Sequence, residues 1–280
     1  MARATLFDRI QKTLATDEEL VTMERELKFH PAGPDVANTL TAKQVTDFNR
    51  DGCLLPIRAY DDHEIAAHRR VFDELLADTL ESGGDSYSLI DPHLSDGRTY
   101  DMMFEPRIVD CVKDLIGPNI ICWSTHYFCK PARESKRVSW HQDAYYWPMT
   151  HSRTVTAWLA IDDVDRENAC MQLVAGSHLH GRIEHRPTRA EEQNVLRFTV
   201  DGVEAYGKII HDELKAGEMS LHADLLLHGS EPNTSDRRRC GLTFRYVDAS
   251  VQNLKDWHKF GVLICGEDPN NHWANPPRPV

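Results

Sequence analysis

A histidine and an aspartate two positions apart, His141 and Asp143, are followed much later in the chain by His228 and then by Arg239. Two imidazoles and one carboxylate on one face of a metal ion are typical of a non-haem iron site, because they leave coordination positions open. Those positions suit a bidentate 2-oxo acid together with O2. Arginine supplies a planar, permanently charged fork for the far carboxylate of such an acid. These residues therefore predict Fe(II) chemistry with a 2-oxo acid as co-substrate.

Strand geometry supports the pairing of His141 with Asp143. Residues i and i+2 of a strand project from the same face, so both side chains can converge on one ion while the residue between them points away. A second pair of the same spacing, His222 and Asp224, lies shortly before His228. It is an alternative metal pair. If it does not bind metal, the strand period places it on the same face as His228, where it can line the cavity.

Composition limits the classes of partner. The chain has 280 residues and a net charge of -12, which argues against nucleic-acid and anionic-membrane surfaces. Seven cysteines are present, an odd number without C-x-x-C spacing, so we expect no disulfide framework and a reducing, cytoplasmic setting. Neither a signal peptide nor a membrane span is expected. The oligomeric state stays open, with a homodimer as one outcome.

Helical spacing comes first in the chain, and alternation with a period of two follows. We expect helices over residues 3–28, 41–50, 62–81 and 105–116. We expect strands over residues 52–57, 120–128, 138–145, 154–161, 170–174, 218–228 and 240–247. This order predicts a mainly β fold with flanking helices, in which a double-sheet core at about residues 119–247 is braced by helices. Residues 1–40 are expected to be a helical appendage and linker, and residues 41–280 a single domain.

Several motifs resemble the phytanoyl-CoA hydroxylase-like family of Fe(II)/2-oxoglutarate dioxygenases. The motifs are Trp140-His141-Gln142-Asp143, the stretches 156–163 and 176–178, and His-Gly-Ser-Glu-Pro-Asn at 228–233 leading to Arg239. The resemblance covers about residues 121–246 and implies a double-stranded β-helix, or jelly roll. It also implies that His141, Asp143 and His228 bind iron. Arg239 would hold the C5 carboxylate of 2-oxoglutarate, helped by a hydroxyl such as that of Thr156 or Ser230.

One turn departs from the family pattern. Family members often read E-N-G-x-M, whereas this chain reads Glu167-Asn168-Ala169-Cys170-Met171. If the missing glycine had a positive φ, Ala169 would be strained there.

The carboxylate of Asp143 favours hydroxylation of a C–H bond. Related halogenases have a small residue at that position, which leaves room for chloride. Desaturation or another oxidative outcome stays open. Two other classes stay open as well. A redox-neutral Zn or Mn enzyme on a jelly roll would have no need for Arg239, and a non-catalytic binding protein would be expected to have a damaged ligand set.

Substrate residues are inferred from the strand period and from charge. Tyr145 and Trp147 share the ligand face if their strand continues, and their rings could hold an amine or a quaternary ammonium group. Arg245 shares a face with Arg239 and could hold an anion, while Asp162 could hold an ammonium. The general similarity is to small-molecule hydroxylases such as those that act on 2-aminoethylphosphonate or its N-methylated relatives.

Overall fold

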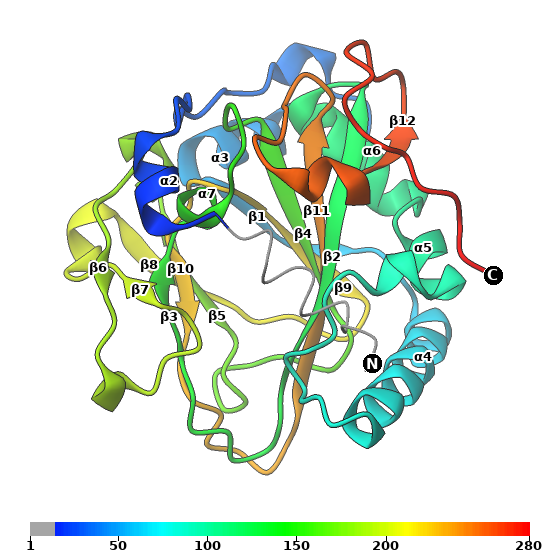
Figure 1. Cartoon of the computed structure of the whole chain (residues 1–280), viewed down its shortest axis with the longest axis vertical. Coiled ribbons are helices and arrows are strands. Elements are labelled where there is room, and N and C mark those ends of the chain that lie inside the picture. The colour runs from blue at the N-terminus through cyan, green and yellow to red at the C-terminus, as the bar shows by residue number, and fades with distance from the viewer. Residues whose placement is uncertain (1–14) are drawn as a thin grey trace, which may run out of the picture.

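Two antiparallel sheets form the centre of the computed structural model, which describes residues 15–280 (Figure 1). The larger sheet has the order β1 (Cys53–Arg58), β9 (Glu218–Ala223), β4 (Thr154–Ala160), β11 (Arg239–Asp248), β2 (Ile120–Lys130) and β12 (Val262–Cys265). The smaller sheet has the order β3 (Val138–His141), β10 (His228–Ser230), β5 (Met171–Ala175) and β8 (Lys208–Asp212). A two-stranded ribbon pairs β6 (Arg186–Pro187) with β7 (Phe198–Thr199). The expected jelly-roll core is confirmed.

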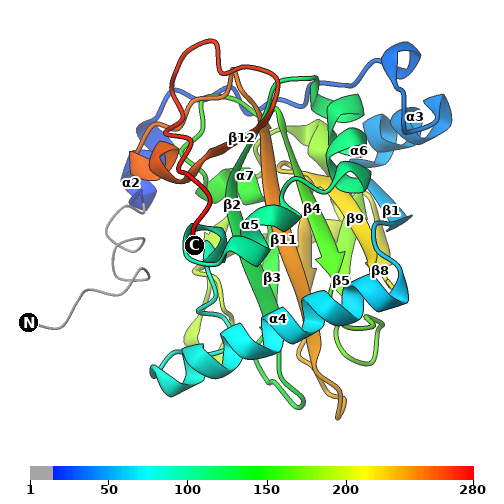
Figure 2. The same ribbon diagram turned by 90° about the vertical axis from the view of Figure 1, so that its right-hand side faces the viewer.

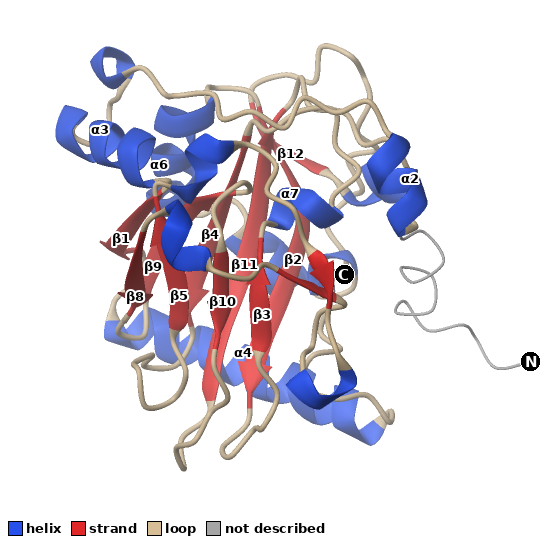
Figure 3. Ribbon diagram, turned by 90° about the vertical axis from the view of Figure 1, so that its left-hand side faces the viewer, coloured by secondary structure: helices blue, strands red, loops and turns tan. Residues whose placement is uncertain are grey.

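Helices cover the outer face of the larger sheet, while the smaller sheet faces its other side (Figures 2 and 3). The α-helices are α2 (Asp17–Thr22), α3 (Ala42–Asp51), α4 (Asp62–Glu81), α5 (Gly97–Met102), α6 (Pro106–Ile116) and α7 (Asp143–Tyr146). Short 3-10 turns are η1 (Pro34–Val36), η2 (Pro92–Leu94), η3 (Ser177–His180), η4 (Ala190–Glu192), η5 (Val203–Tyr206) and η6 (Asp256–Phe260). Among the described residues, none of these helices combines the length and hydropathy that a membrane crossing requires.

Local sequence signals explain where the main helices begin and end. Helix α3 begins after Thr41, whose hydroxyl accepts a hydrogen bond from the Gln44 backbone N–H, and it ends at Gly52 with φ 78°. Helix α4 begins after Asp61, whose carboxylate accepts hydrogen bonds from two backbone N–H groups of the first turn. The predicted spans of α3, α4 and α6 are therefore confirmed to within one or two residues.

Strand β11 separates the two environments of the larger sheet. Its residues Cys240, Leu242, Phe244 and Tyr246 have no exposed surface and pack into the core beneath α4 and α6. The alternate residues Arg239, Thr243 and Arg245 line a cavity between the sheets. A single strand period thus buries an apolar row on one side and presents two arginines on the other.

Two expected strands are wrong in their extent. Residues 218–228 do not form one strand, because the chain turns after β9, where the Leu226 N–H donates to the Ala223 carbonyl, and His228 begins β10 in the other sheet. The strand expected over 138–145 stops at His141, where the chain passes into α7. The positions of such turns depend on tertiary contacts, which a local hydrophobic period does not reveal.

The expected helix over residues 3–28 is also corrected. Residues 3–14 lie outside the described part, and beyond them only Asp17–Thr22 is helical. The following segment is extended and lies against the barrel. There the guanidinium of Arg25 donates to the carbonyls of Ala144 and Trp147, both at 2.9 Å. The backbone of Glu26 forms an isolated parallel β-bridge with that of His151.

Gly241 leaves space for an indole, which gives a test of the packing. A Cβ at this position would lie 2.0 Å from Cζ2 of Trp158, a ring that lines the cavity. We expect Gly241→Ala to destabilise the protein by about 3 kcal/mol, because the ring and strand must shift. A matched Gly202→Ala change meets no atom within 4 Å and has only its φ of 62° against it, so it should cost about 1 kcal/mol. Urea denaturation measures both, and equal losses would contradict the packing.

Candidate active site

His141, Asp143 and His228 come together where β3 pairs with β10. His228 is the direct antiparallel partner of His141, and their ring centroids are 4.1 Å apart. Asp143 follows on the first turn of α7, and its Oδ1 lies 3.5 Å from Nε2 of His141 and 3.9 Å from Nε2 of His228. One potential ligand atom from each residue lies within 4.8 Å of the others, and all three residues are buried. The structure therefore brings the three predicted ligands to one point.

Hydrogen bonds fix both imidazoles in an orientation that suits metal binding. Nδ1 of His141 is 2.8 Å from the Ser139 carbonyl oxygen, and Nδ1 of His228 is 3.0 Å from that of Leu226. A carbonyl accepts a hydrogen bond from a protonated Nδ1, so each Nε2 presents its lone pair to the common centre. The side chain of Gln142 points away, as expected, and donates to the carbonyls of Gly181 and Leu225.

Electrostatics favours the ligand forms of the site. Burial alone would raise the pKa of Asp143, but the side-chain hydrogen bond with His141 and the nearby charge of Arg245 act against it, and that pKa lies below its usual value. Burial holds the pKa of His228 well below its usual value. An anionic carboxylate beside an imidazole that burial keeps uncharged is the state that a divalent metal requires. The N, N, O donor set fits Fe(II).

The alternative pair does not form a second chelate. Within residues 15–280, His141, Asp143 and His228 are the group that could hold an ion. His222 lines the cavity, with Nε2 3.9 Å from Oδ2 of Asp143. Asp224 is buried but is not part of the cavity wall, and burial raises its pKa to about 7. The pair therefore splits, and only His222 reaches the cavity.

The cavity has a volume of about 980 Å³, and Arg239 is buried in its wall. Nε of Arg239 donates to the Ala169 carbonyl at 3.1 Å, and the guanidinium lies over the Trp158 ring at 5.5 Å. The backbone of Ala169 has φ 68°, which is the left-handed conformation that strains a residue with a Cβ. The carbonyl of Ala169 thus orients the Arg239 side chain through Nε. The two Nη groups of the guanidinium remain available to bind a carboxylate.

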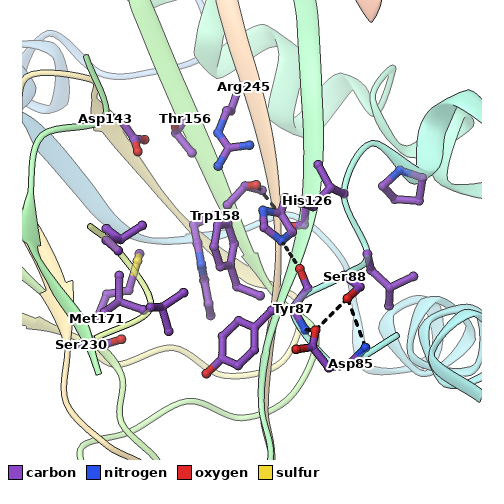
Figure 4. A pocket seen from close by; sticks show the side chains of 18 of the residues that line it. Asp85, Tyr87, Ser88, His126, Asp143, Thr156, Trp158, Met171, Ser230 and Arg245 are labelled. Atoms are coloured by element: carbon purple, nitrogen blue, oxygen red, sulfur yellow. Dashed lines mark hydrogen bonds between the residues drawn. The ribbon is translucent and has the colours of Figure 1, made fainter. Parts of the chain in front are cut away.

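Different hydroxyls lie at the two ends of the cavity (Figure 4). Lys130 is the cross-strand partner of Arg239 and donates to the Ser230 carbonyl at 3.3 Å, which places Ser230 at the Arg239 end. Tyr87 lies toward the same end of the cavity as Ser230 in Figure 4, and its hydroxyl is buried without a hydrogen-bond partner among the described residues. Sequence reasoning missed Tyr87, which lies in the loop after α4 and belongs to no periodic element.

Thr156 lies elsewhere than the sequence suggested. It is the cross-strand partner of Arg245, six positions along β11 from Arg239. Strand rise separates positions six apart by about 20 Å. The expectation that the Thr156 hydroxyl assists Arg239 is therefore wrong.

Two further expected substrate residues lie outside the cavity wall. Tyr145 stacks on His185 with centroids 4.0 Å apart, because β3 has ended and α7 rotates the side chain away from the ligand face. Asp162 forms ion pairs with Arg69 at 3.1 Å and Arg238 at 2.9 Å. Both expectations are corrected. Trp147 and Arg245 do line the cavity, and the wall also contains residues that the sequence did not single out, including Tyr146, His126 and Phe128.

A sequence model of the phytanoyl-CoA dioxygenase (PhyH) family matches residues 48–241, a stretch that contains the three candidate ligands and Arg239. The chain belongs to this family. The PhyH family consists of Fe(II)- and 2-oxoglutarate-dependent dioxygenases, so the resemblance in the motifs is confirmed.

The curated relatives align with only part of this chain. Identity is 29% over 156 residues to the peroxisomal phytanoyl-CoA dioxygenase of Bos taurus, covering 53% of this chain and 46% of the bovine protein, so the chain spans about half the length of that relative. Identity is 28% to a probable alpha-ketoglutarate-dependent hypophosphite dioxygenase of Stutzerimonas stutzeri, covering 61% of this chain and 60% of that protein. The solved structure of the non-heme monooxygenase ThoJ has a TM-score of 0.68 at 26% identity, covering 84% of this chain and 87% of ThoJ.

Ala169 gives a test of the turn that orients Arg239. Removing a left-handed non-glycine conformation should return about 1–3 kcal/mol, whereas losing one buried methyl costs about 0.8 kcal/mol. We therefore expect Ala169→Gly to stabilise the protein by about 1 kcal/mol. Ala157→Gly, in the buried strand β4, should destabilise it. Denaturant midpoints give both values, and a loss of stability in Ala169→Gly would show that the turn is not strained.

Proposed function

We propose that this chain is an Fe(II)- and 2-oxoglutarate-dependent dioxygenase that hydroxylates a C–H bond of a small molecule. The observation that carries the proposal is that the three candidate ligands and the buried Arg239 line one cavity. Iron held by His141, Asp143 and His228 would supply O2 activation and the oxidation of both 2-oxoglutarate and the substrate. The overall change balances as substrate C–H, O2 and 2-oxoglutarate giving the alcohol, succinate and CO2.

The chain's own residues bind and orient the co-substrate. The fork of Arg239 would pair with the C5 carboxylate, with its Nε already held by the Ala169 carbonyl. The hydroxyls of Tyr87 and Ser230 lie at the same end and can donate to that carboxylate. Burial of the arginine against Trp158 lowers the local dielectric, which strengthens these charge-assisted hydrogen bonds. A redox-neutral metal enzyme would have no use for this buried arginine.

For the substrate, we propose an aminoalkylphosphonate or a related amine or quaternary ammonium compound. The cavity wall carries both signs of charge, with Arg245 on the sheet and Asp78 and Asp85 at and after the end of α4. Aromatic rings of Tyr146 and Trp147 also face the cavity and suit a cationic group. PhyH relatives named for phytanoyl-CoA, hypophosphite and ectoine show how widely substrates vary in this family. Free cysteines throughout the described chain fit the proposed cytoplasmic setting.

An anaerobic titration with Fe(II) and then 2-oxoglutarate tests the reaction class, because a chelated 2-oxo acid gives a visible charge-transfer band. We expect the band in the wild-type protein and its loss in His141→Ala. Arg239→Gln should need about 100-fold more 2-oxoglutarate, since losing a buried charge-assisted pair costs about 3 kcal/mol. Arg238→Gln is the matched control, because that neighbour pairs with Asp162 and Asp73 instead. Iron bound without any band would refute the dioxygenase proposal.

The same titration tests which hydroxyl assists Arg239. Tyr87→Phe removes a buried, unpartnered donor at the Arg239 end and should weaken 2-oxoglutarate binding about 5- to 10-fold, equivalent to a hydrogen bond worth about 1–1.5 kcal/mol. Thr156→Val should leave this binding unchanged, because Thr156 lies beside Arg245. The opposite pattern would restore Thr156 to the co-substrate site.

A further inference from the structure

The second arginine of the cavity, Arg245, has an incompletely satisfied guanidinium. One Nη donates to the Ser124 hydroxyl at 3.0 Å, while Nε is buried and has no hydrogen-bond partner in the described part of the chain. Aromatic rings surround the group, with Trp147 at 5.5 Å and Trp123 and Phe128 each at 5.8 Å from the guanidinium carbon. Within residues 15–280, the ion pairs do not include Arg245. A fixed cation that lines a cavity without a paired anion calls for one from outside the chain.

Two neighbouring residues in the same row of the sheet share this property. Arg245 is the cross-strand partner of Thr156, and Thr156 is in turn the partner of His222. The hydroxyl of Thr156 and Nδ1 of His222 are both buried, and neither has a hydrogen-bond partner among residues 15–280. All three residues line the cavity. Cross-strand neighbours lie about 5 Å apart, so Arg245, Thr156 and His222 form one row of adjacent polar groups that can each bind a ligand.

The carboxylates near Arg245 do not neutralise it. Asp91 is buried, its Oδ1 accepts a hydrogen bond from the Thr125 backbone N–H, and among the described residues it forms no ion pair with Arg245. Asp143 also acts on Arg245 through space, but its charge belongs to the metal that the three ligands are proposed to hold. The positive charge therefore remains available to a ligand in the cavity.

This row lies beside the metal ligand Asp143 and six positions along β11 from Arg239. Nε2 of His222 is 3.9 Å from Oδ2 of Asp143. Figure 4 shows Asp143, Thr156 and Arg245 at one end of the cavity and Tyr87 and Ser230 toward the other. A molecule held by Arg245 would thus lie next to the metal without displacing 2-oxoglutarate from Arg239.

We propose that Arg245, Thr156 and His222 form an oxyanion subsite that binds the acidic group, a phosphonate or a carboxylate, of the primary substrate. The inference rests on the proposed function and adds to it that an acid group is required, whatever else the substrate carries. The Arg245 fork supplies charge and direction, the Thr156 hydroxyl donates a second hydrogen bond, and the His222 ring closes the row. The aromatic rings exclude water from the pair and so strengthen it.

Binding of small probes to the anaerobic Fe(II) and 2-oxoglutarate complex tests the subsite. The probes are ethylphosphonate, propionate and tetramethylammonium, and their binding is followed by calorimetry and by perturbation of the charge-transfer band. We expect one or both acids to bind, and the stronger of them identifies the acid group. In Arg245→Met the affinity for that acid should fall about 10- to 100-fold, as for loss of a charged hydrogen bond. Thr156→Val should lower it several-fold.

Matched variants separate this inference from the proposed function. Arg245→Lys keeps the charge and should bind the acid with intermediate affinity, which also serves if Arg245→Met folds poorly. Arg153→Met removes an arginine that lies outside the cavity wall, next to Asp248, and should change nothing. A normal band in every Arg245 variant with unchanged acid binding would overturn the subsite alone. Preference of the wild-type protein for tetramethylammonium, or no acid binding at all, would also overturn it. Loss of the band in the wild-type protein would instead refute the dioxygenase proposal.

Discussion

The antiparallel pairing of β10 with β3 is the interaction on which the candidate site depends. It sets His228 directly opposite His141, although the two residues are distant in the sequence. Because cross-strand neighbours approach to about 5 Å, the pairing alone brings two imidazoles to one ion. The turn after β9 makes this pairing possible, since a continuous strand would have kept His228 in the larger sheet. Every other part of the site is arranged around that point.

The opposite wall is governed by the alternation of β11. One row of its side chains fills the core beneath the helices, and the other row presents Arg239 and Arg245 to the cavity. Six positions of extended strand separate the backbones of the two arginines, so that two anions can be held at different places in one chamber. The apolar row is also what makes buried cations tolerable, because it fixes the strand and its register against the helices. Apolar packing on one face of β11 thus holds the two arginines in position on the other face.

Much of this arrangement could be predicted from the sequence, for identifiable reasons. Types and spacing of His141, Asp143, His228 and Arg239 were sufficient to name a metal and a co-substrate, and the period of two was sufficient for most strands. Register was not predictable, and it is register that moves Thr156 from Arg239 to Arg245. The end of β3 was not predictable either, and it turns Tyr145 onto His185. Tyr87 carries no periodic signal at all, because loop residues are placed by contacts distant in sequence.

The extended segment before η1 contains no candidate site residue, yet it contacts the helix that carries one. Arg25 is hydrogen-bonded to the carbonyl of Ala144 within α7 and to the carbonyl of Trp147 just after it, and Asp143 begins that helix. A chain shortened to begin at α3 would keep every strand of both sheets, every candidate ligand and both cavity arginines. It would nevertheless leave these two carbonyls without their Arg25 donor, so the turn that carries Asp143 would lose one of its anchors. The smallest unit that preserves the geometry of the metal site is therefore larger than the barrel that contains it.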